Sequence, residues 1–395
     1  MDAAYLWDWA NLLLRWLHVI TGIAWIGASF YFIALDNSLE KPADGDPLVR
    51  GEQWSIHGGG VYYKRKYKGA PPALPERLHW FKWEAYWTWL SGFALFVLIY
   101  WGQASTYLID PAVAEVSPLA AILASLAMIV SAWFAYDALC RSRLGAHEGR
   151  LLAAGAVLLV AYVVLATQLF SGRGAFLLIG AITGTIMVAN VAHVIIPGQR
   201  RMVAAMAEGR EPDPVHGLMG KQRSVHNTYL TLPVVVLMLS PHYPMLTQER
   251  WNWLALLLLV LAGALVRQFF VLRHAGRAPL WLPVAGVVAL GVLALLVVPR
   301  ADPRFSGAEA ASFARAQAIA AAHCAQCHAT RPSFEGIAAP PKGVVLETGA
   351  QLRRWASAVR QQVQSEAMPP GNVTELSDAD RARIVAWVAA GAKAD

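Results

Sequence analysis

Two cysteines and a histidine near the C-terminus form the clearest chemical motif of the chain. The run His323-Cys324-Ala325-Gln326-Cys327-His328 has the spacing C-x-x-C-H. Two thiols one helical turn apart can form thioethers to the haem vinyl groups while the next imidazole ligates the iron. The alternatives are a disulfide and a thioredoxin-like redox pair. Because the remaining cysteine, Cys140, ends an apolar segment far away, we interpret it as an ordinary membrane thiol. The motif predicts one covalent haem c held by Cys324, Cys327 and His328.

Met368 is the predicted second ligand of the haem iron. It is the only methionine after Met245, and after residue 274 the only histidines are His323 and His328. A thioether opposite histidine raises the haem potential and suits an electron carrier. The rigid turn Pro369-Pro370-Gly371 follows and can hold the side chain over the iron. The alternative is a methionine that only fills the core.

The segments around this motif have the pattern of a small helical domain. An Ala-rich helix is expected from Phe313 to His323, and Ser377 is the expected N-cap of a closing helix. The apolar residues of that closing helix are Ile384, Val385, Trp387 and Val388. Residues 305–395 resemble the class I cytochrome c fold, and the resemblance implies that haem is attached outside the cytoplasmic membrane of a bacterium.

The chain as a whole is too apolar for an ordinary soluble protein. Of the 395 residues, 56% are hydrophobic and 15% are charged, and the mean hydropathy is +0.41. A membrane span needs about 20 apolar residues. We therefore expect an all-α fold, with a polytopic bundle of about eight transmembrane helices in residues 1–299 and a cytochrome c domain in 300–395. The expected spans are 10–35, 83–102, 118–139, 151–170, 174–196, 227–240, 251–273 and 280–298.

Two of these spans need comment. The first opens with Asp2 and Asp8 and lacks both a basic segment and an A-x-A cleavage site, so we expect a retained helix and not a cleaved signal peptide. The sixth is the least regular, because Pro233 interrupts it and polar residues precede it.

The distribution of lysine and arginine predicts the orientation. The loops after spans one, three, five and seven hold 18 of these residues, whereas the opposite loops hold only Arg173 and Arg250. Positive loops stay cytoplasmic, so both termini and the cytochrome domain are expected on the periplasmic side of a bacterial inner membrane. The net charge of +7 then favours contact with anionic lipid headgroups or an anionic substrate. It gives no support for nucleic acid binding.

Ionisable residues inside the spans are the candidates for function, because they are costly in a bilayer. In the first span a spacing of three and four residues predicts one inward helix face, formed by Arg15, His18, Gly22, Trp25 and Ser29. We expect a further set mostly in the cytoplasmic half, namely Glu84, Asn190, His193, His226, Asn227 and Arg267, with His57 and His79 in the first loop. The alternative for His57, His79, His226 and Arg267 is a position at the membrane surface. His18 lies deeper and has three candidate roles: ligand of a b-type haem, part of a proton path, or contact to substrate.

Four stretches of the membrane part resemble a known family. Together with the C-x-x-C-H domain they look like the membrane-bound, cytochrome c-fused bacterial urate oxidases (urate hydroxylases), over essentially the whole chain. The first stretch alone also resembles membrane haem proteins of the protoporphyrinogen oxidase and copper-resistance type, in which a histidine at the position of His18 binds haem. The four stretches are 16–27, 79–86, 194–200 and 226–233.

The resemblance implies oxidation of urate to 5-hydroxyisourate, with electrons leaving through haem c to a terminal oxidase or a soluble cytochrome c. Urate is a planar anion that suits an arginine fork, aromatic stacking and imidazole hydrogen bonds. The candidate catalytic residues are His18, Arg15, Glu84, His226 and Arg267. A substrate site in the cytoplasmic half lies most of a bilayer from haem c, which favours a b-type haem at His18 as a relay.

Two other classes of function remain open from the sequence. The first is a non-catalytic membrane anchor that carries electrons for a separate dehydrogenase. The second is a transporter with an appended cytochrome, which the redox domain disfavours. An anchor predicts a bundle without a substrate cavity.

Overall fold

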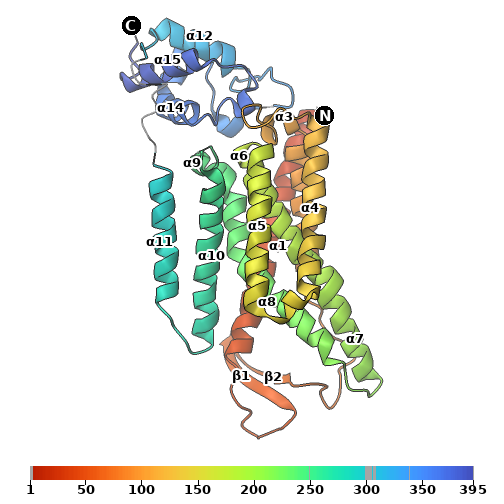
Figure 1. Cartoon of the computed structure of the whole chain (residues 1–395). Helices are drawn as coiled ribbons and strands as arrows, with labels where there is room; N and C mark the ends of the chain where they lie inside the picture. The colour runs from red at the N-terminus through yellow and green to blue at the C-terminus, as the bar shows by residue number, and fades with distance from the viewer. Residues whose placement is uncertain (1–2, 249, 299–304, 306–307, 338, 395) are drawn as a thin grey trace.

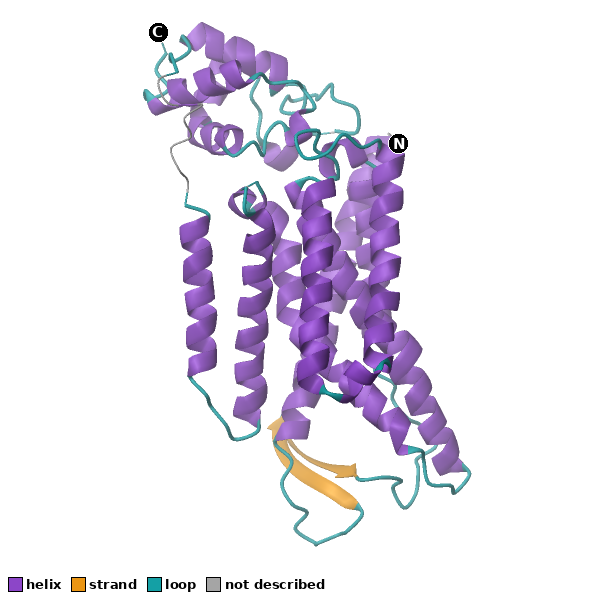
Figure 2. Cartoon of the chain, viewed as in Figure 1, coloured by secondary structure: helices purple, strands orange, loops and turns teal. Residues whose placement is uncertain are grey.

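The computed structural model describes residues 3–248, 250–298, 305, 308–337 and 339–394. A bundle of long helices carries a small helical domain at one end (Figure 1). The fold is all-α, as expected, apart from one β-hairpin at the other end (Figure 2).

Eight helical segments form the bundle within the described part of the chain. Short helices lie in their connections, namely α3 (Ala104–Tyr107), η2 (Arg143–Ala146), η4 (Ser240–His242) and α9 (Pro244–Thr247). Two long segments contain a π-helical stretch, η1 and η3. The eight segments are α1 (Ala3–Asn37), α2 (Trp83–Phe96) with η1 (Val97–Trp101), α4 (Pro118–Arg141), α5 (Glu148–Leu169), α6 (Gly172–Ala189) with η3 (Asn190–Ile195) and α7 (Ile196–Ala207), α8 (Pro214–Leu239), α10 (Asn252–His274) and α11 (Trp281–Leu296).

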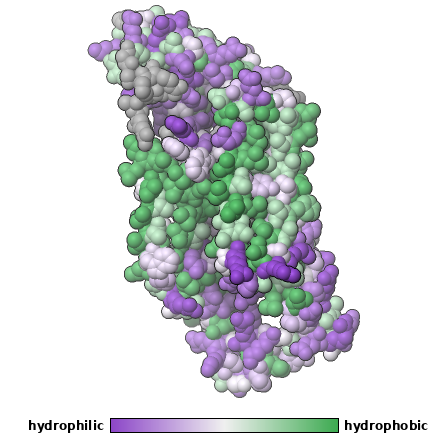
Figure 3. All heavy atoms as spheres, viewed as in Figure 1, coloured by the Kyte–Doolittle hydropathy of each residue, from purple (hydrophilic) through white to green (hydrophobic). Residues whose placement is uncertain are grey.

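Length and apolarity identify the bundle as a membrane domain. Five of the described helices are long and apolar enough to cross a bilayer, and α11 is a shorter apolar helix. An apolar belt separates two polar ends of the molecule (Figure 3). Large apolar side chains such as Trp16, Ile23, Leu152 and Leu295 are exposed on the bundle. Lipid covers such a surface, so the protein is an integral membrane protein.

Helix α6 forms the centre of the bundle. Most of its side chains are buried, and it contacts α2, α4, α5 and α8. Its first turn begins at Ser171, whose hydroxyl accepts a hydrogen bond from the amide of Gly174 at 3.1 Å. A Cβ on Gly172 would lie 1.7 Å from the carbonyl oxygen of Thr247, so only glycine permits this close approach.

The sixth span differs from the expected one. Helix α8 begins at Pro214, well before residue 227, and continues through Pro233. Its first half is polar and packs against η3 and α7 on one side, while Val215, Leu218 and Lys221 are exposed on the other. At Pro233 the neighbouring helix α10 supplies Gly263, where a Cβ would lie 3.1 Å from the proline ring.

The loops alternate between the two ends of the bundle, as expected for successive spans. The connection from α1 to α2 forms the antiparallel hairpin β1 (Val49–His57) and β2 (Gly60–Tyr67). Its turn residues Gly58 and Gly59 have φ values of 57° and 78°, which glycine adopts without strain. The hairpin, η2, α7 and the α10–α11 connection lie at one end, and the C-terminal domain lies at the other (Figure 1).

The C-terminal domain contains the two helices that the sequence predicted. Helix α12 covers Phe313–His323, and the hydroxyl of Ser377 caps α15 (Asp378–Ala389) by accepting from the amide of Asp380 at 3.1 Å. Between them lie η6 (Pro341–Gly343), α13 (Gly349–Arg354), α14 (Ala356–Gln364) and η7 (Pro370–Asn372). Apolar residues of α12, α13, α14 and α15 form its core. The predicted boundary at 299/300 lies outside the described residues.

Contacts between described residues hold this domain against the bundle. Gln103 donates to the carbonyl of Gly336 at 3.0 Å, and Arg173 donates to the carbonyl of Ala367 at 3.0 Å. Helix η7 packs on α3, where a Cβ on Gly371 would lie 3.1 Å from the carbonyl oxygen of Ile109. The face beside Met368 therefore rests on the membrane domain.

Candidate functional site

The C-x-x-C-H motif lies directly after α12. Cys324 and Cys327 are half-buried and are not joined in a disulfide. Burial and the neighbouring Cys327 raise the pKa of the Cys324 thiol to about 11. Two protonated thiols at this spacing fit the addition to haem vinyl groups that forms thioethers.

The imidazole of His328 is oriented for an iron ligand. Its Nδ1 donates to the carbonyl of Val344 at 2.9 Å, which leaves the lone pair of Nε2 available. Burial lowers the pKa of His328, so the neutral form that binds metal is favoured. These residues fit haem c, and this cofactor supplies one-electron redox chemistry when bound.

Met368 lies in a loop that a buried arginine holds in place. Arg381, on α15, is 3% exposed, and its Nη1 donates to the carbonyls of Val363 at 2.8 Å and Met368 at 3.0 Å. Arg381 was not predicted from the sequence. The available signal was its spacing of three and four residues from Ile384 and Val385, which puts a charge on the apolar face of the closing helix.

His18 lies between α1 and α2. Its Nδ1 is 2.9 Å from the carbonyl oxygen of Thr88 and 3.3 Å from Oγ of Ser91. Since a carbonyl only accepts, Nδ1 carries the proton and the Nε2 lone pair is left for another partner. A Cβ on Gly92 would lie 2.6 Å from the ring of His18, so glycine makes room for the imidazole. If a b-type haem binds in the membrane domain, His18 would hold its iron through Nε2.

The expected inward face of α1 is only partly correct. Gly22 faces Thr88, Trp25 packs on the cluster around Ala85, and Ser29 lies 3.5 Å from the hydroxyl of Thr228. Arg15, however, is exposed, and among the described residues its side chain bonds only to Asn11 of its own helix. The reason is that α1 packs along α2 and touches α8 and α10 only lightly, so most of its surface has no protein neighbour.

The other candidates do not gather into one site. The carboxylate of Glu84 is half-buried and has no hydrogen-bond or ion-pair partner in the described part of the chain. His57, His79 and His193 are exposed. Within residues 3–394, gaps excepted, no group of three or more His, Cys, Asp or Glu side chains is arranged to hold a metal ion.

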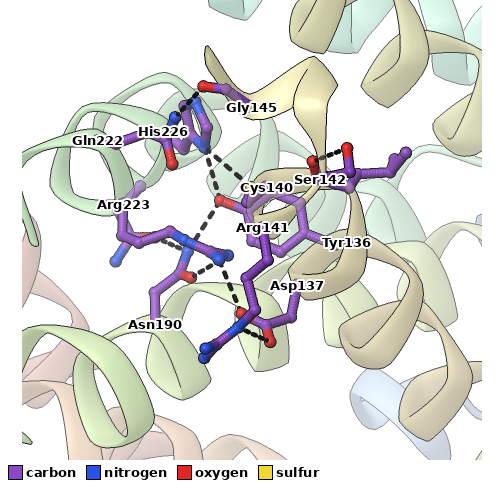
Figure 4. A network of polar contacts seen from close by, with 12 residues as sticks. Tyr136, Asp137, Cys140, Arg141, Ser142, Gly145, Asn190, Gln222, Arg223 and His226 are labelled. Carbon is purple, nitrogen blue, oxygen red and sulfur yellow. Dashed lines mark hydrogen bonds and ion pairs between the residues drawn. The ribbon is translucent and has the colours of Figure 1, made fainter. Parts of the chain in front are cut away.

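His226 and Asn190 belong to a largely buried polar network between α4, η3 and α8 (Figure 4). The hydroxyl of Tyr136 lies 2.6 Å from Nδ1 of His226 and accepts from Asn190 at 3.2 Å. Asn190 also donates to Asn227 at 2.8 Å. His226 and Asn227 lie in the middle of α8 and not at its start as expected.

A charged pair completes this polar network. Arg223 is 1% exposed, and its Nη2 donates to Asp137 at 2.7 Å while its Nη1 donates to Asn190 at 3.2 Å. From the sequence, Arg223 was expected among the loop charges, and Asp137 and Tyr136 were not predicted as site residues. The available signal was an aspartate within the last turn and a half of an otherwise apolar helix.

Arg267 lies in a different place, beside a hollow between α1, α8 and α10. Its side chain is 3% exposed, and its Cζ lies 3.7 Å from the centre of the Phe30 ring. The hollow has a volume of about 440 Å³, and its lining residues are Phe30, Tyr31, Ala34, Leu232, Arg267, Phe270 and His274. A cavity of this size suits a small organic molecule.

Fold and site together define a polytopic membrane redox protein with an attached c-type cytochrome domain. Residues 4–298 match the family described as urate oxidase N-terminal, and residues 311–388 match the family described as cytochrome C oxidase, cbb3-type, subunit III. The chain therefore belongs to the urate oxidase N-terminal family, as the resemblance of its four stretches indicated. No curated protein and no solved structure matches the chain.

Proposed function

We propose that the protein oxidises urate to 5-hydroxyisourate in its membrane domain and passes the electrons through its cytochrome domain to the respiratory chain. The observation that carries this proposal is the urate oxidase family match over residues 4–298 in one chain with a c-type cytochrome domain. Urate monoanion and water give neutral 5-hydroxyisourate, one proton and two electrons. A terminal oxidase or a soluble cytochrome c is the proposed final acceptor.

We extend the proposal to His18 as the ligand of a b-type haem between the substrate and the cytochrome domain. The free Nε2 of His18 and the space that Gly92 leaves for the ring support it. Arg15, Glu84 and His226 remain candidate catalytic residues. The exposed position of Arg15 and the Tyr136 contact of His226 favour structural roles for these two.

Anaerobic addition of urate to the purified full-length protein tests the function. We expect urate to reduce haem c, seen in its visible absorption, with two haem c equivalents reduced per urate consumed. His18→Ala is expected to block reduction by urate but not by dithionite. A folded wild-type protein whose haem c responds to dithionite but not to urate would leave the electron-transfer anchor as the function.

The proposed orientation places the cytochrome domain in the periplasm and the β1–β2 hairpin in the cytoplasm. Its support is the excess of lysine and arginine in the loops at the hairpin end. A reporter enzyme that is active only in the periplasm should be active when fused after Pro299 and silent when inserted at the hairpin turn, Gly58-Gly59. The reverse pattern of reporter activity would refute the orientation.

A further inference from the structure

The bundle contains two buried arginines, and their surroundings differ. Arg223 has a carboxylate, Asp137, at 2.7 Å. Arg267 has no ion-pair partner in the part of the chain that the structure describes, and its Nε and Nη2 lack any hydrogen bond there. Burying a cation without a counter-charge is costly. The ring of Phe30 offsets part of that cost through a cation–π contact at 3.7 Å.

The two unsatisfied atoms of Arg267 indicate the kind of ligand that its guanidinium could bind. Nε and Nη2 lie on one edge of the guanidinium and together form a two-pronged donor. Such a fork matches two adjacent acceptor atoms of a planar anion, and an ammonium group cannot reproduce it. Both atoms have less than 1 Å² of accessible surface, so an anion in the hollow reaches them after the lining side chains move. Once bound, it would satisfy both donors and supply the missing negative charge.

The rest of the hollow suits a flat aromatic ring. Phe30, Tyr31 and Phe270 supply aromatic surface around Arg267. The Nζ of Lys64, on strand β2, lies 5.1 Å from the ring centre of Tyr31. This lysine adds positive charge on the hairpin side of the hollow, which favours the approach of an anion.

The geometry points to this hollow as the urate site, with Arg267 binding the urate anion through an adjacent oxygen and nitrogen. The inference rests on the proposed function and adds to it the place and the recognition chemistry. Substrate then enters between α1, α8 and α10, in the half of the bundle that bears the hairpin. The polar network around Arg223 is not the substrate site, because Asp137 supplies the counter-charge and Asn190 a further acceptor. Among the described residues only Nε of Arg223 lacks a partner.

Urate binding to the full-length protein with its haem kept reduced by dithionite tests the site without turnover. In nanodiscs of phosphatidylcholine alone, Arg267→Gln is expected to raise the Kd of urate by about ten- to a hundred-fold. Arg267→Lys should give an intermediate Kd, because it keeps the charge and loses the fork. The matched control Arg273→Gln removes an exposed arginine of the same helix and should change the Kd by less than about two-fold.

The outcomes separate the inference from the proposed function. Urate that binds in an Arg267-dependent way but does not reduce oxidised haem c would refute the function and keep the site. An unchanged Kd in Arg267→Gln, with wild-type haem c still reduced by urate, would refute the site alone. If Arg267→Gln does not fold, Phe30→Leu replaces it, and an unchanged Kd there would also count against the site. Anionic phospholipid that co-purifies with the wild-type protein before nanodisc assembly is measured as well. Its loss from Arg267→Gln, with an unchanged urate Kd, would assign the fork to a lipid headgroup instead.

Discussion

The double substitution Cys324→Ala, Cys327→Ala is expected to abolish haem staining of the protein on a denaturing gel. Only thioether bonds keep haem on an unfolded chain, and the third cysteine, Cys140, lies in the membrane domain at the end of α4. The stain is therefore expected to fall to background and not merely to weaken.

Met368→Ala is the matched control for this loss. The substituted protein should keep its covalent haem and its stain, because Met368 forms no thioether bond. Its haem potential should fall and its iron should bind small ligands such as carbon monoxide, since the thioether ligand is gone. Persistent staining of the double cysteine variant would refute covalent attachment, and an unchanged potential in Met368→Ala would assign the sixth ligand to another residue.

Asp137→Leu is expected to cause a large loss of stability in the membrane domain. The substitution leaves the guanidinium of Arg223, 1% exposed, without a counter-charge among the described residues. Its remaining contacts there are the amide oxygen of Asn190 and the ring of Tyr136. Removing one partner of a buried ion pair costs about 3–5 kcal/mol. Thermal unfolding of the detergent-solubilised protein, followed by intrinsic tryptophan fluorescence, should show a clearly lowered Tm.

Two further variants isolate the buried pair as the cause. Arg141 contacts the other oxygen of Asp137 at 2.6 Å but is 54% exposed, so Arg141→Gln should cost no more than about 1 kcal/mol. The double substitution Asp137→Leu, Arg223→Met should recover most of the stability, because no unpaired charge remains. Equal losses in Asp137→Leu and Arg141→Gln would show that burial of the pair does not matter.

The C-terminal domain could be predicted well because its signals are local. The C-x-x-C-H spacing, the helix Phe313–His323 and the cap at Ser377 each depend on a few neighbouring residues. Most spans were also predictable, since lipid contact requires a continuous apolar stretch. The hairpin was not predicted from the sequence, although Gly58-Gly59 is a typical two-residue turn between strands.

The sites in the bundle were harder to predict, because tertiary packing decides them. The start of α8 was missed because its first half is polar and is held by contacts to η3 and α7, which an apolar span pattern does not predict. Asp137 and Arg223 are far apart in sequence, and only the fold makes them partners. Arg15 was wrongly assigned to an inward face, since helical spacing tells which residues share a face but not which face has a neighbour.

The docking of the C-terminal domain through Gln103 and Arg173 has a kinetic consequence. Many electron carriers shuttle, swinging between donor and acceptor so that diffusion limits each delivery. Here the face beside Met368 lies against the membrane domain, which is the electron donor under the proposed function, so an acceptor can dock on another face while the domain stays in place. Under that proposal each electron enters and leaves the cytochrome domain through separate surfaces. Electron transfer then requires no movement of the domain between donor and acceptor.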